Sequence, residues 1–348
     1  MDANLPSALD AVRRERRERL GSRPPGQRPT IAVLADQPDD DLVAALTACG
    51  WHVSGVLPGD VFDGLLWAAR TAGVERNYVE LTELLLDPAL DAACLVAGSP
   101  ALPSVLRAGL HALLPAPVDV PCTLLRDALD TAEEVGVEHA VGFAARWTVP
   151  VATVTRLLDG EPAPQQITVR AWPTGPVATA ELLDVVTAWC GDVVAVCAAP
   201  QALPARELPG GAQVRWAVLT ERASTVLVAH DGAPGPVLRL SFPGGRLELT
   251  GDRVGWDDGR PIAVAPVPWP PDDDGLPVGP APQAADVGLL VTAHRLALAA
   301  DEGEDGALAG PAADGHQAPG TLRDLFVVAR LREALRQSAA ESRWVETA

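Results

Sequence analysis

The chain has 348 residues, 48% of them hydrophobic, and a formal net charge of −19 at pH 7. This length predicts about two domains of roughly 150 residues each, and the absence of any apolar run near the ~18 residues of a membrane span predicts a soluble protein. The acidic balance argues against a nucleic-acid binder, which needs clustered cations to contact phosphates.

An arginine-rich arm occupies residues 1–28. In the string AVRRERRERLGSRPP, five Arg fall within seven residues. The interleaved Glu residues suit a solvated helix better than a phosphate clamp. We therefore expect a mobile tail or a partner contact, in preference to a nucleic-acid tether.

Residues 29–146 alternate strands with helices. TIAVLA, WHVSGVL, DAACLVAG and EHAVGFAARW read as strands, whereas LVAALTACG, VFDGLLWAARTAGV, ELTELLLDP and TLLRDALDTAEEVGV read as helices. This alternation predicts a parallel sheet covered on both faces, in an α/β domain of the Rossmann type.

Residues 147–348 follow a different pattern. Two helical strings, VATVTRLLDG and ATAELLDVVTAWCG, accompany many strand-like runs in which apolar and polar residues alternate, such as VLRLSF and GRLELTG. Such alternation predicts a sheet with one solvated face, hence an α+β domain with an open, largely antiparallel sheet. A strong amphipathic helix closes the chain at about residues 320–346, and the sequence leaves open whether it packs back on the first domain.

Four strings, in this order, carry a resemblance to a known family. They are YVELTELLLDPALDAACLVAGSP, AGLHALLPAP, AVGFAARWTVP and REALRQSAAESRWVE. The third contains Gly142, Phe143, Arg146 and Pro150 at the spacing of a family motif. Together they resemble the Gfo/Idh/MocA family of NAD(P)-dependent oxidoreductases, as a degenerate member, over about residues 29–346. The resemblance implies a Rossmann-like domain followed by the α+β domain.

The resemblance places the family's glycine-rich phosphate turn on a segment without glycine. The positions concerned are Ala35, Asp36, Gln37, Pro38, Asp39 and Asp40. Side chains there crowd the approach of a pyrophosphate and carboxylates repel it, whereas acids at the start of a helix are good caps. Ser99 and Pro100 match the family's Thr-Pro turn beside the cofactor. We therefore expect that no cofactor binds, with NAD(P) as the alternative.

The catalytic positions that the resemblance implies are also altered. Ala116 stands at the family's lysine, and all 27 basic residues are Arg, so no lysine replaces it. Glu181 and Asp184 match the family's acid/base pair; they lie three residues apart, on one helix face. Either they serve as acid and base, or they are a polar pair at an interdomain cleft that no longer has a catalytic function. 

Aromatic and metal-ligating residues add less to the prediction. Arg146, Trp147 and Trp172 are candidates for a substrate pocket, although core filling is the commoner role of Trp. No cluster of His, Cys and Asp has the spacing of a metal site. The five cysteines contain no CxxC pair and the N-terminus has no secretion signal, so we expect free thiols in the cytoplasm.

Two functions follow from the sequence, which leaves open whether the chain is an enzyme. In the first, it has lost dinucleotide binding and hydride transfer and acts as a binding or partner subunit. It would then bind a small molecule or protein and form a homo-oligomer or hetero-oligomer through the sheet of the second domain. In the second, it is a working NAD(P)-dependent oxidoreductase on a sugar, cyclitol or similar alcohol, with Glu181 and Asp184 as acid and base.

Overall fold

The structure is a computed structural model in which the chain forms two compact units. It describes residues 5–20, 22–24, 27–37, 39–59, 67, 71, 73–96, 100–158, 164–173, 175–198, 213–222, 224–230, 237–250, 253–258, 262, 287–302 and 320–347. The first unit takes its described residues from 1–144, 268–313 and 318–325, and the second from 145–267 and 326–348. The predicted helix at about residues 61–73 lies almost wholly outside the described residues.

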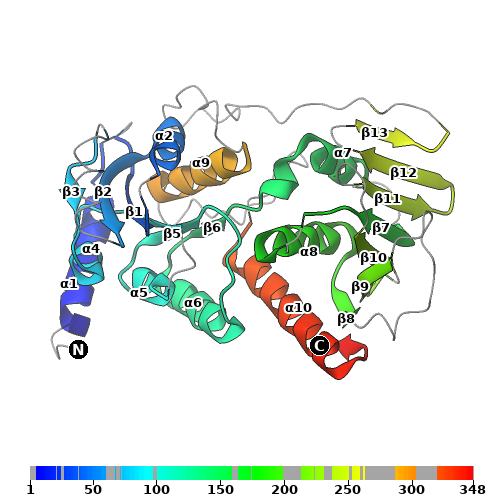
Figure 1. Ribbon diagram of the computed structural model, residues 1–348. Helices are drawn as coiled ribbons and strands as arrows, with labels where there is room; N and C mark the ends of the chain where they lie inside the picture. Colours follow the sequence, from blue (N-terminus) through cyan, green and yellow to red (C-terminus); the bar gives the residue numbers. More distant parts are fainter. Residues whose placement is uncertain are drawn as a thin grey trace. The chain divides into compact units, whose positions relative to one another are not determined.

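A six-stranded parallel sheet, sheet A, forms the centre of the first unit (Figure 1). Its strand order is β3-β2-β1-β4-β5-β6, and every neighbouring pair is parallel. The strands are β1 Thr30–Ala35, β2 His52–Pro58, β3 Arg76–Asn77, β4 Ala92–Leu95, β5 His111–Leu114 and β6 His139–Val141. This confirms the predicted Rossmann-like domain.

Helices of the first unit come from both ends of the chain. They are α1 Leu5–Leu20, α2 Asp40–Ala48, α4 Leu81–Leu85, α5 Leu102–Arg107, α6 Cys122–Val135 and α9 Val287–Glu302. Helix α9 packs on α2 next to the start of β2: the Trp51 indole N–H donates to the Ala293 carbonyl at 2.9 Å, and the Cys49 thiol to the Leu290 carbonyl at 3.2 Å. Ile31 and Val33 of β1 are fully buried in this core, as a strand covered on both faces requires.

The second unit contains an eight-stranded sheet, sheet B. Its order is β13-β12-β11-β7-β10-β9-β8-β14. The strands are β7 Gln166–Arg170, β8 Val193–Cys197, β9 Gln213–Thr220, β10 Thr225–His230, β11 Val237–Phe242, β12 Gly245–Thr250, β13 Arg253–Trp256 and β14 Val345–Glu346. Only β7 and β10 pair in parallel within this sheet. The predicted largely antiparallel sheet is confirmed.

Alternation along β11 and β12 gives this sheet two different faces. Leu238, Leu240 and Leu247 are buried on one face, whereas Arg239 pairs across the strands with Glu248 on the other, at 2.6 Å. The helices of this unit are η1 Ala144–Trp147, α7 Val149–Leu158, α8 Pro176–Cys190 and α10 Leu322–Glu341; η1 and α10 each begin in the first unit. Each helix in the described part of the chain is too short or too polar to span a membrane.

The arginine-rich arm differs from its prediction. Residues 5–20 form α1, and the Arg16 side chain, 2% exposed, is bonded to backbone carbonyls of the first unit. The expectation of a mobile tail is therefore wrong for this helix. The Glu residues between the arginines made the helix look solvated, but the helix face that carries Arg16 points to the protein.

Candidate functional site

The turn between β1 and α2 is the first part of the candidate site. Asp39 is the N-cap of α2, with φ −134° and ψ 91°, and its carboxylate accepts the Leu42 N–H at 2.9 Å. An N-cap carboxylate satisfies one of the helix's unpaired N–H groups and interacts favourably with the positive end of the helix dipole. The role of this acid as a helix cap is thus confirmed.

A cavity of about 620 Å³ opens at this turn. It is lined by Ala35, Asp36, Gln37, Asp39, Asp40, Asp41 and Val96. Ala35 ends β1 and Val96 follows β4, so the cavity lies at the carboxyl ends of these two neighbouring strands. The chain continues from β1 to β2 and β3 on one side of β1, and then crosses to β4 on its other side. This reversal makes the place between β1 and β4 the switch point of the sheet, where open α/β sheets bind ligands.

The four carboxylates of the cavity are not equivalent. Asp39 caps α2, and Asp40 accepts hydrogen bonds from the Trp67 indole at 3.0 Å and the Thr71 hydroxyl at 3.1 Å. Asp36 and Asp41 are exposed and make no side-chain hydrogen bond to another described residue. Within the described residues, the carboxylate oxygens of these last two are therefore the ones available to a ligand.

The remaining residues predicted near a cofactor are Pro38, Ser99 and Pro100. Pro100 is exposed just before α5 and does not line the cavity, and Ser99 lies outside the described residues, as does Pro38. Their role stays a prediction.

The residue that the resemblance aligns with the family's lysine, Ala116, comes shortly after β5. Ala116 is half-buried there, in the turn from Pro115 to Pro117. The end of β6 approaches this turn so closely that a Cβ on Gly142 would lie 2.3 Å from the Pro115 carbonyl oxygen. Gly142 is therefore required by packing, and Ala116 has no group that donates or accepts a proton.

Glu181 and Asp184 lie together on α8 in the second unit, and both are buried. The Ala145 N–H donates to Oε2 of Glu181 at 2.8 Å. Both oxygens of Asp184 accept from the Arg146 guanidinium, from Nε at 2.7 Å and from Nη2 at 2.6 Å. The two carboxylates thus fix the start of the second unit onto α8, as charge-assisted and bidentate bonds do well.

The three candidate substrate-pocket residues lie near these carboxylates in sequence or space. Arg146 is held by Asp184, and Trp147 beside it is buried with 8% of its surface exposed. The Trp172 indole donates to the Ala178 carbonyl at 2.8 Å, at the start of α8. Their pocket role stays a prediction. Within the described residues, no three His, Cys, Asp or Glu side chains form a group that could hold a metal.

The sequence and the fold can now be compared with those of known proteins. No protein-family model matches the sequence, and a search of curated proteins gives no match. Solved structures do match. An oxidoreductase from Agrobacterium radiobacter in complex with NAD+, L-tartaric acid and magnesium is 15% identical, with a TM-score of 0.64, over 92% of this chain and 98% of that one.

Two further structures agree with the first. An NAD binding oxidoreductase from Klebsiella pneumoniae is 16% identical with a TM-score of 0.65, over 92% of this chain and 99% of that one. A levoglucosan dehydrogenase in complex with NADH is 14% identical with a TM-score of 0.67, over 92% and 100%. The chain has the fold of these NAD-binding oxidoreductases. The resemblance to the Gfo/Idh/MocA oxidoreductases is thus confirmed at the level of the fold.

The expectation that no cofactor binds is contradicted by these comparisons. Structures that match 92% of the chain hold NAD+ or NADH, so the fold points to a nucleotide cofactor. The error came from treating the glycine turn as the whole site. The switch point of sheet A forms a cavity here without any glycine in the turn, because the strand order rather than the turn separates the two halves of the sheet.

Proposed function

We propose that the protein binds a nicotinamide dinucleotide at the cavity of sheet A and acts as an oxidoreductase on a sugar, cyclitol or similar alcohol. The observation that carries the proposal is the place of the cavity, at the switch point between β1 and β4. Its volume of about 620 Å³ lies within the usual range of small-molecule sites.

The residues of the cavity fit one part of a dinucleotide better than another. Carboxylates accept hydrogen bonds from hydroxyl groups, so Asp36 and Asp41 suit a ribose. A pyrophosphate on the α2 N-terminus does not fit, because Asp39 already accepts the Leu42 N–H and like charges repel. A bound dinucleotide would therefore have to hold its pyrophosphate away from this turn, and NAD, without the 2′-phosphate of NADP, would be the preferred form.

The substrate class is supported by the names of structural relatives. One is a levoglucosan dehydrogenase in complex with NADH and L-sorbose, and another is a putative myo-inositol dehydrogenase from Sinorhizobium meliloti. Both names point to polyhydroxylated carbon rings or chains. Glu181 is the better candidate for proton transfer, since Asp184 gives both of its oxygens to Arg146.

Titration of the purified protein with NADH and NADPH tests this function. Binding followed by nicotinamide fluorescence and calorimetry should be saturable for NADH and weaker for NADPH. A panel of sugars and cyclitols should then give dinucleotide reduction that Glu181→Gln lowers at least tenfold in kcat. Absence of binding to either dinucleotide would refute the proposal.

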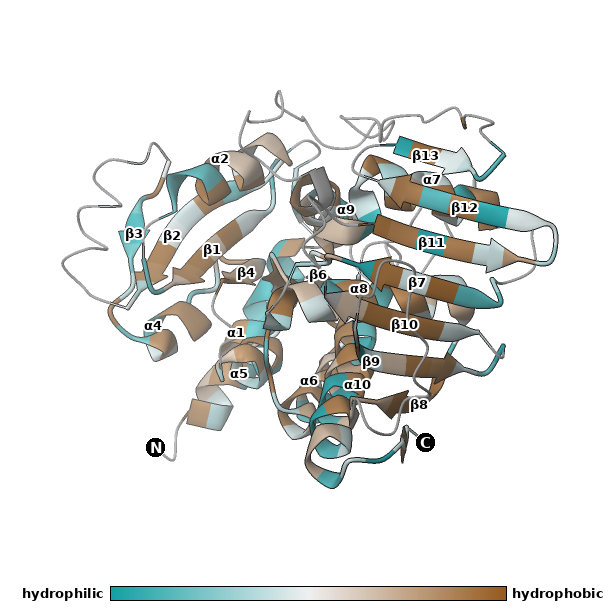
Figure 2. Ribbon diagram, turned by 45° about the vertical axis from the view of Figure 1, so that its right-hand side comes forward, coloured by the Kyte–Doolittle hydropathy of each residue, from teal (hydrophilic) through white to brown (hydrophobic). Residues whose placement is uncertain are grey.

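A non-catalytic partner subunit is the second candidate. It is favoured by Ala116, which cannot move a proton, and by the apolar residues on sheet B. Figure 2 shows hydrophobic colouring on β8, β9 and β10. Leu219 and Val194 in these strands are 37% and 41% exposed. Association through this sheet, with a second copy or a related chain, would then be the function.

Dinucleotide binding without turnover, together with a concentration-dependent mass in sedimentation, would favour the second candidate over the first. A cytoplasmic location belongs to either proposal and is supported by the cysteines, all five of which are free thiols.

A further inference from the structure

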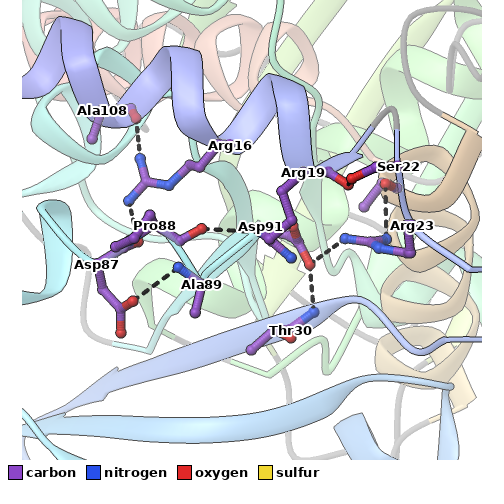
Figure 3. A network of polar contacts seen from close by, with 11 residues as sticks. Arg16, Arg19, Ser22, Arg23, Thr30, Asp87, Pro88, Ala89, Asp91 and Ala108 are labelled. Atoms are coloured by element: carbon purple, nitrogen blue, oxygen red, sulfur yellow. Dashed lines mark hydrogen bonds and ion pairs between the residues drawn. The ribbon is translucent and has the colours of Figure 1, made fainter.

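The arginine-rich arm makes its deepest contact through Arg16 (Figure 3). This guanidinium donates to the carbonyls of Leu85 at 2.8 Å and Asp87 at 2.7 Å, and also to the carbonyl of Ala108. Burial lowers its pKa from 12.5 to about 10, which leaves it charged at neutral pH. A buried cation with three carbonyl partners is a specific contact and not a solvated side chain.

The carbonyls that the arm contacts belong to helix C-termini. Leu85 is the last residue of α4 and Ala108 directly follows α5. Arg17 donates at 3.4 Å to the carbonyl of Val135, the last residue of α6. The last carbonyls of a helix lack intrahelical donors and carry the negative end of its dipole, so cations there are favourable.

A fourth helix is contacted by the end of the arm. Arg23 donates at 3.3 Å to the carbonyl of Ala300, in the last turn of α9. Arginines of one segment thus reach the C-terminal carbonyls of α4, α5, α6 and α9. In a parallel α/β unit these helix ends gather at the amino ends of the strands, which explains how a single segment meets them all.

Asp91 anchors the arm at the same edge of sheet A. This buried carboxylate pairs with Arg19 and with Arg23, the latter at 2.5 Å, and accepts the N–H of Thr30 at 2.7 Å. Thr30 begins β1 and Asp91 precedes β4. The carboxylate therefore ties the arm to the amino ends of two central strands.

The remainder of α1 is bound more weakly. Arg16 is its only buried residue, and the other residues of the helix are half-buried or exposed. Guanidinium contacts, more than an apolar helix face, hold the arm in place. An element with little buried apolar surface opens at lower free energy than the core.

We propose that the amino edge of sheet A is a binding site for an arginine-bearing helix, occupied in cis by α1, and that it accepts the same helix in trans when the contact of Arg16 is removed. The ligand class is a cationic helical peptide whose guanidinium groups cap several helices at once. Arg16 and Arg23 are turned to carbonyls and to Asp91, which leaves these two side chains unable to hold a nucleic-acid phosphate.

The test uses the full chain with Arg16→Met and, as a matched control, Arg14→Met. Arg14 is exposed on the same helix and makes no hydrogen bond or ion pair to another described residue. We expect Arg16→Met to lower Tm by about 5 °C or more, from the loss of charge-assisted bonds at two helix ends. The control should change Tm by less than about 1 °C.

A labelled peptide of residues 5–24 then measures the site itself. By fluorescence anisotropy it should bind the Arg16→Met chain roughly tenfold more tightly than the wild type, where α1 occupies the site. The same peptide carrying Arg16→Met should not bind either chain. If the Met variant fails to fold, Arg16→Lys replaces it, since it keeps the charge and loses the planar fork.

Equal Tm values for the Arg16 and Arg14 variants would overturn the proposal. So would equal affinity of the peptide for the wild-type and variant chains, or binding of the peptide that carries Arg16→Met. These outcomes are independent of dinucleotide binding, because they concern the opposite edge of the sheet.

Discussion

Charged side chains stabilise helix ends at both edges of sheet A, but the charges at the two edges are opposite. At the carboxyl edge, Asp39 caps the positive N-terminus of α2; at the amino edge, Arg16 and Arg23 cap the negative C-termini of α4, α5 and α9. From the sequence, the acidic run was interpreted as a helix start, whereas the arginine run was interpreted as a solvated arm. The comparison teaches that charges beside a parallel sheet must first be assigned to helix ends, and that only the remainder is available for a ligand.

The largest expected effect on stability comes from a substitution at the amino edge. Asp91→Ala should destabilise the protein by about 3–5 kcal/mol, because it leaves the buried Arg23 without its counter-charge and the Thr30 N–H without an acceptor. Urea unfolding measures the loss. Asp127→Ala is the control: it removes an exposed pair with Arg107, for which we expect less than about 1 kcal/mol. Equal losses in the two variants would contradict the assignment of Asp91 as the anchor.

The amino edge should also be the acid-sensitive one. Burial lowers the pKa of His111 from 6.5 to about 4, and its Nδ1 accepts the Glu138 N–H at 3.0 Å. His111 binds its proton at a higher pH in the unfolded chain than in the folded one. The stabilisation that comes from keeping His111 neutral in the folded state is therefore complete above pH 6.5. It is lost as the pH falls from 6.5 to about 4, by about 3 kcal/mol in total.

Unfolding free energies measured between pH 7 and pH 4 check this dependence. In His111→Gln, the part of the slope that His111 causes should disappear. An unchanged slope would show that other groups, such as the neighbouring carboxylates, dominate the acid response.

The carboxyl edge should respond less. Asp39→Ala removes the cap of α2 and should cost about 1 kcal/mol, whereas Asp39→Asn keeps a side-chain acceptor and should cost less than about 0.5 kcal/mol. Thermal unfolding of both variants distinguishes them. A similar loss in Asn and Ala would mean that the charge of Asp39, and not its hydrogen bond to Leu42, stabilises the helix.

The sequence predicted the two edges unequally. Strand and helix periodicity predicted the parallel sheet through the strands that became β1, β2, β4 and β6, and the acids of the first turn were correctly assigned to a helix start. The arm was misjudged because its partners are backbone carbonyls, such as those of Leu85 and Ala108, which have no signature in sequence. The cavity was also missed: it depends on the order β2-β1-β4, a long-range pairing that local patterns do not encode.

The second unit shows the same limit at shorter range. Spacing alone predicted that Glu181 and Asp184 share a helix face, and the structure confirms that placement. It could not predict their partners. Ala145 and Arg146 lie 36 and 38 residues away in sequence, and only the packing of η1 against α8 brings them within hydrogen-bond distance.

The smallest expected effect on stability tests which carboxylates are available to a ligand and which stabilise a helix end. Asp36 bonds to no other described side chain and caps no described helix, so Asp36→Asn should leave the unfolding free energy within about 0.5 kcal/mol of the wild-type value.

The effect of Asp36→Asn should appear in dinucleotide binding instead. Replacing the carboxylate weakens its hydrogen bonds to a ribose hydroxyl, so NADH affinity should fall by about 1 kcal/mol, or roughly fivefold. NADPH should lose less, because the substitution also removes repulsion of its 2′-phosphate, and parallel calorimetric titrations measure both. Asp40→Asn is a useful comparison, because Asp40 lines the same cavity but is also bonded to Trp67 and Thr71; it should change binding and stability together. If Asp36→Asn alters stability and not affinity, the carboxyl edge resembles the amino edge fully, and its charges serve the fold alone.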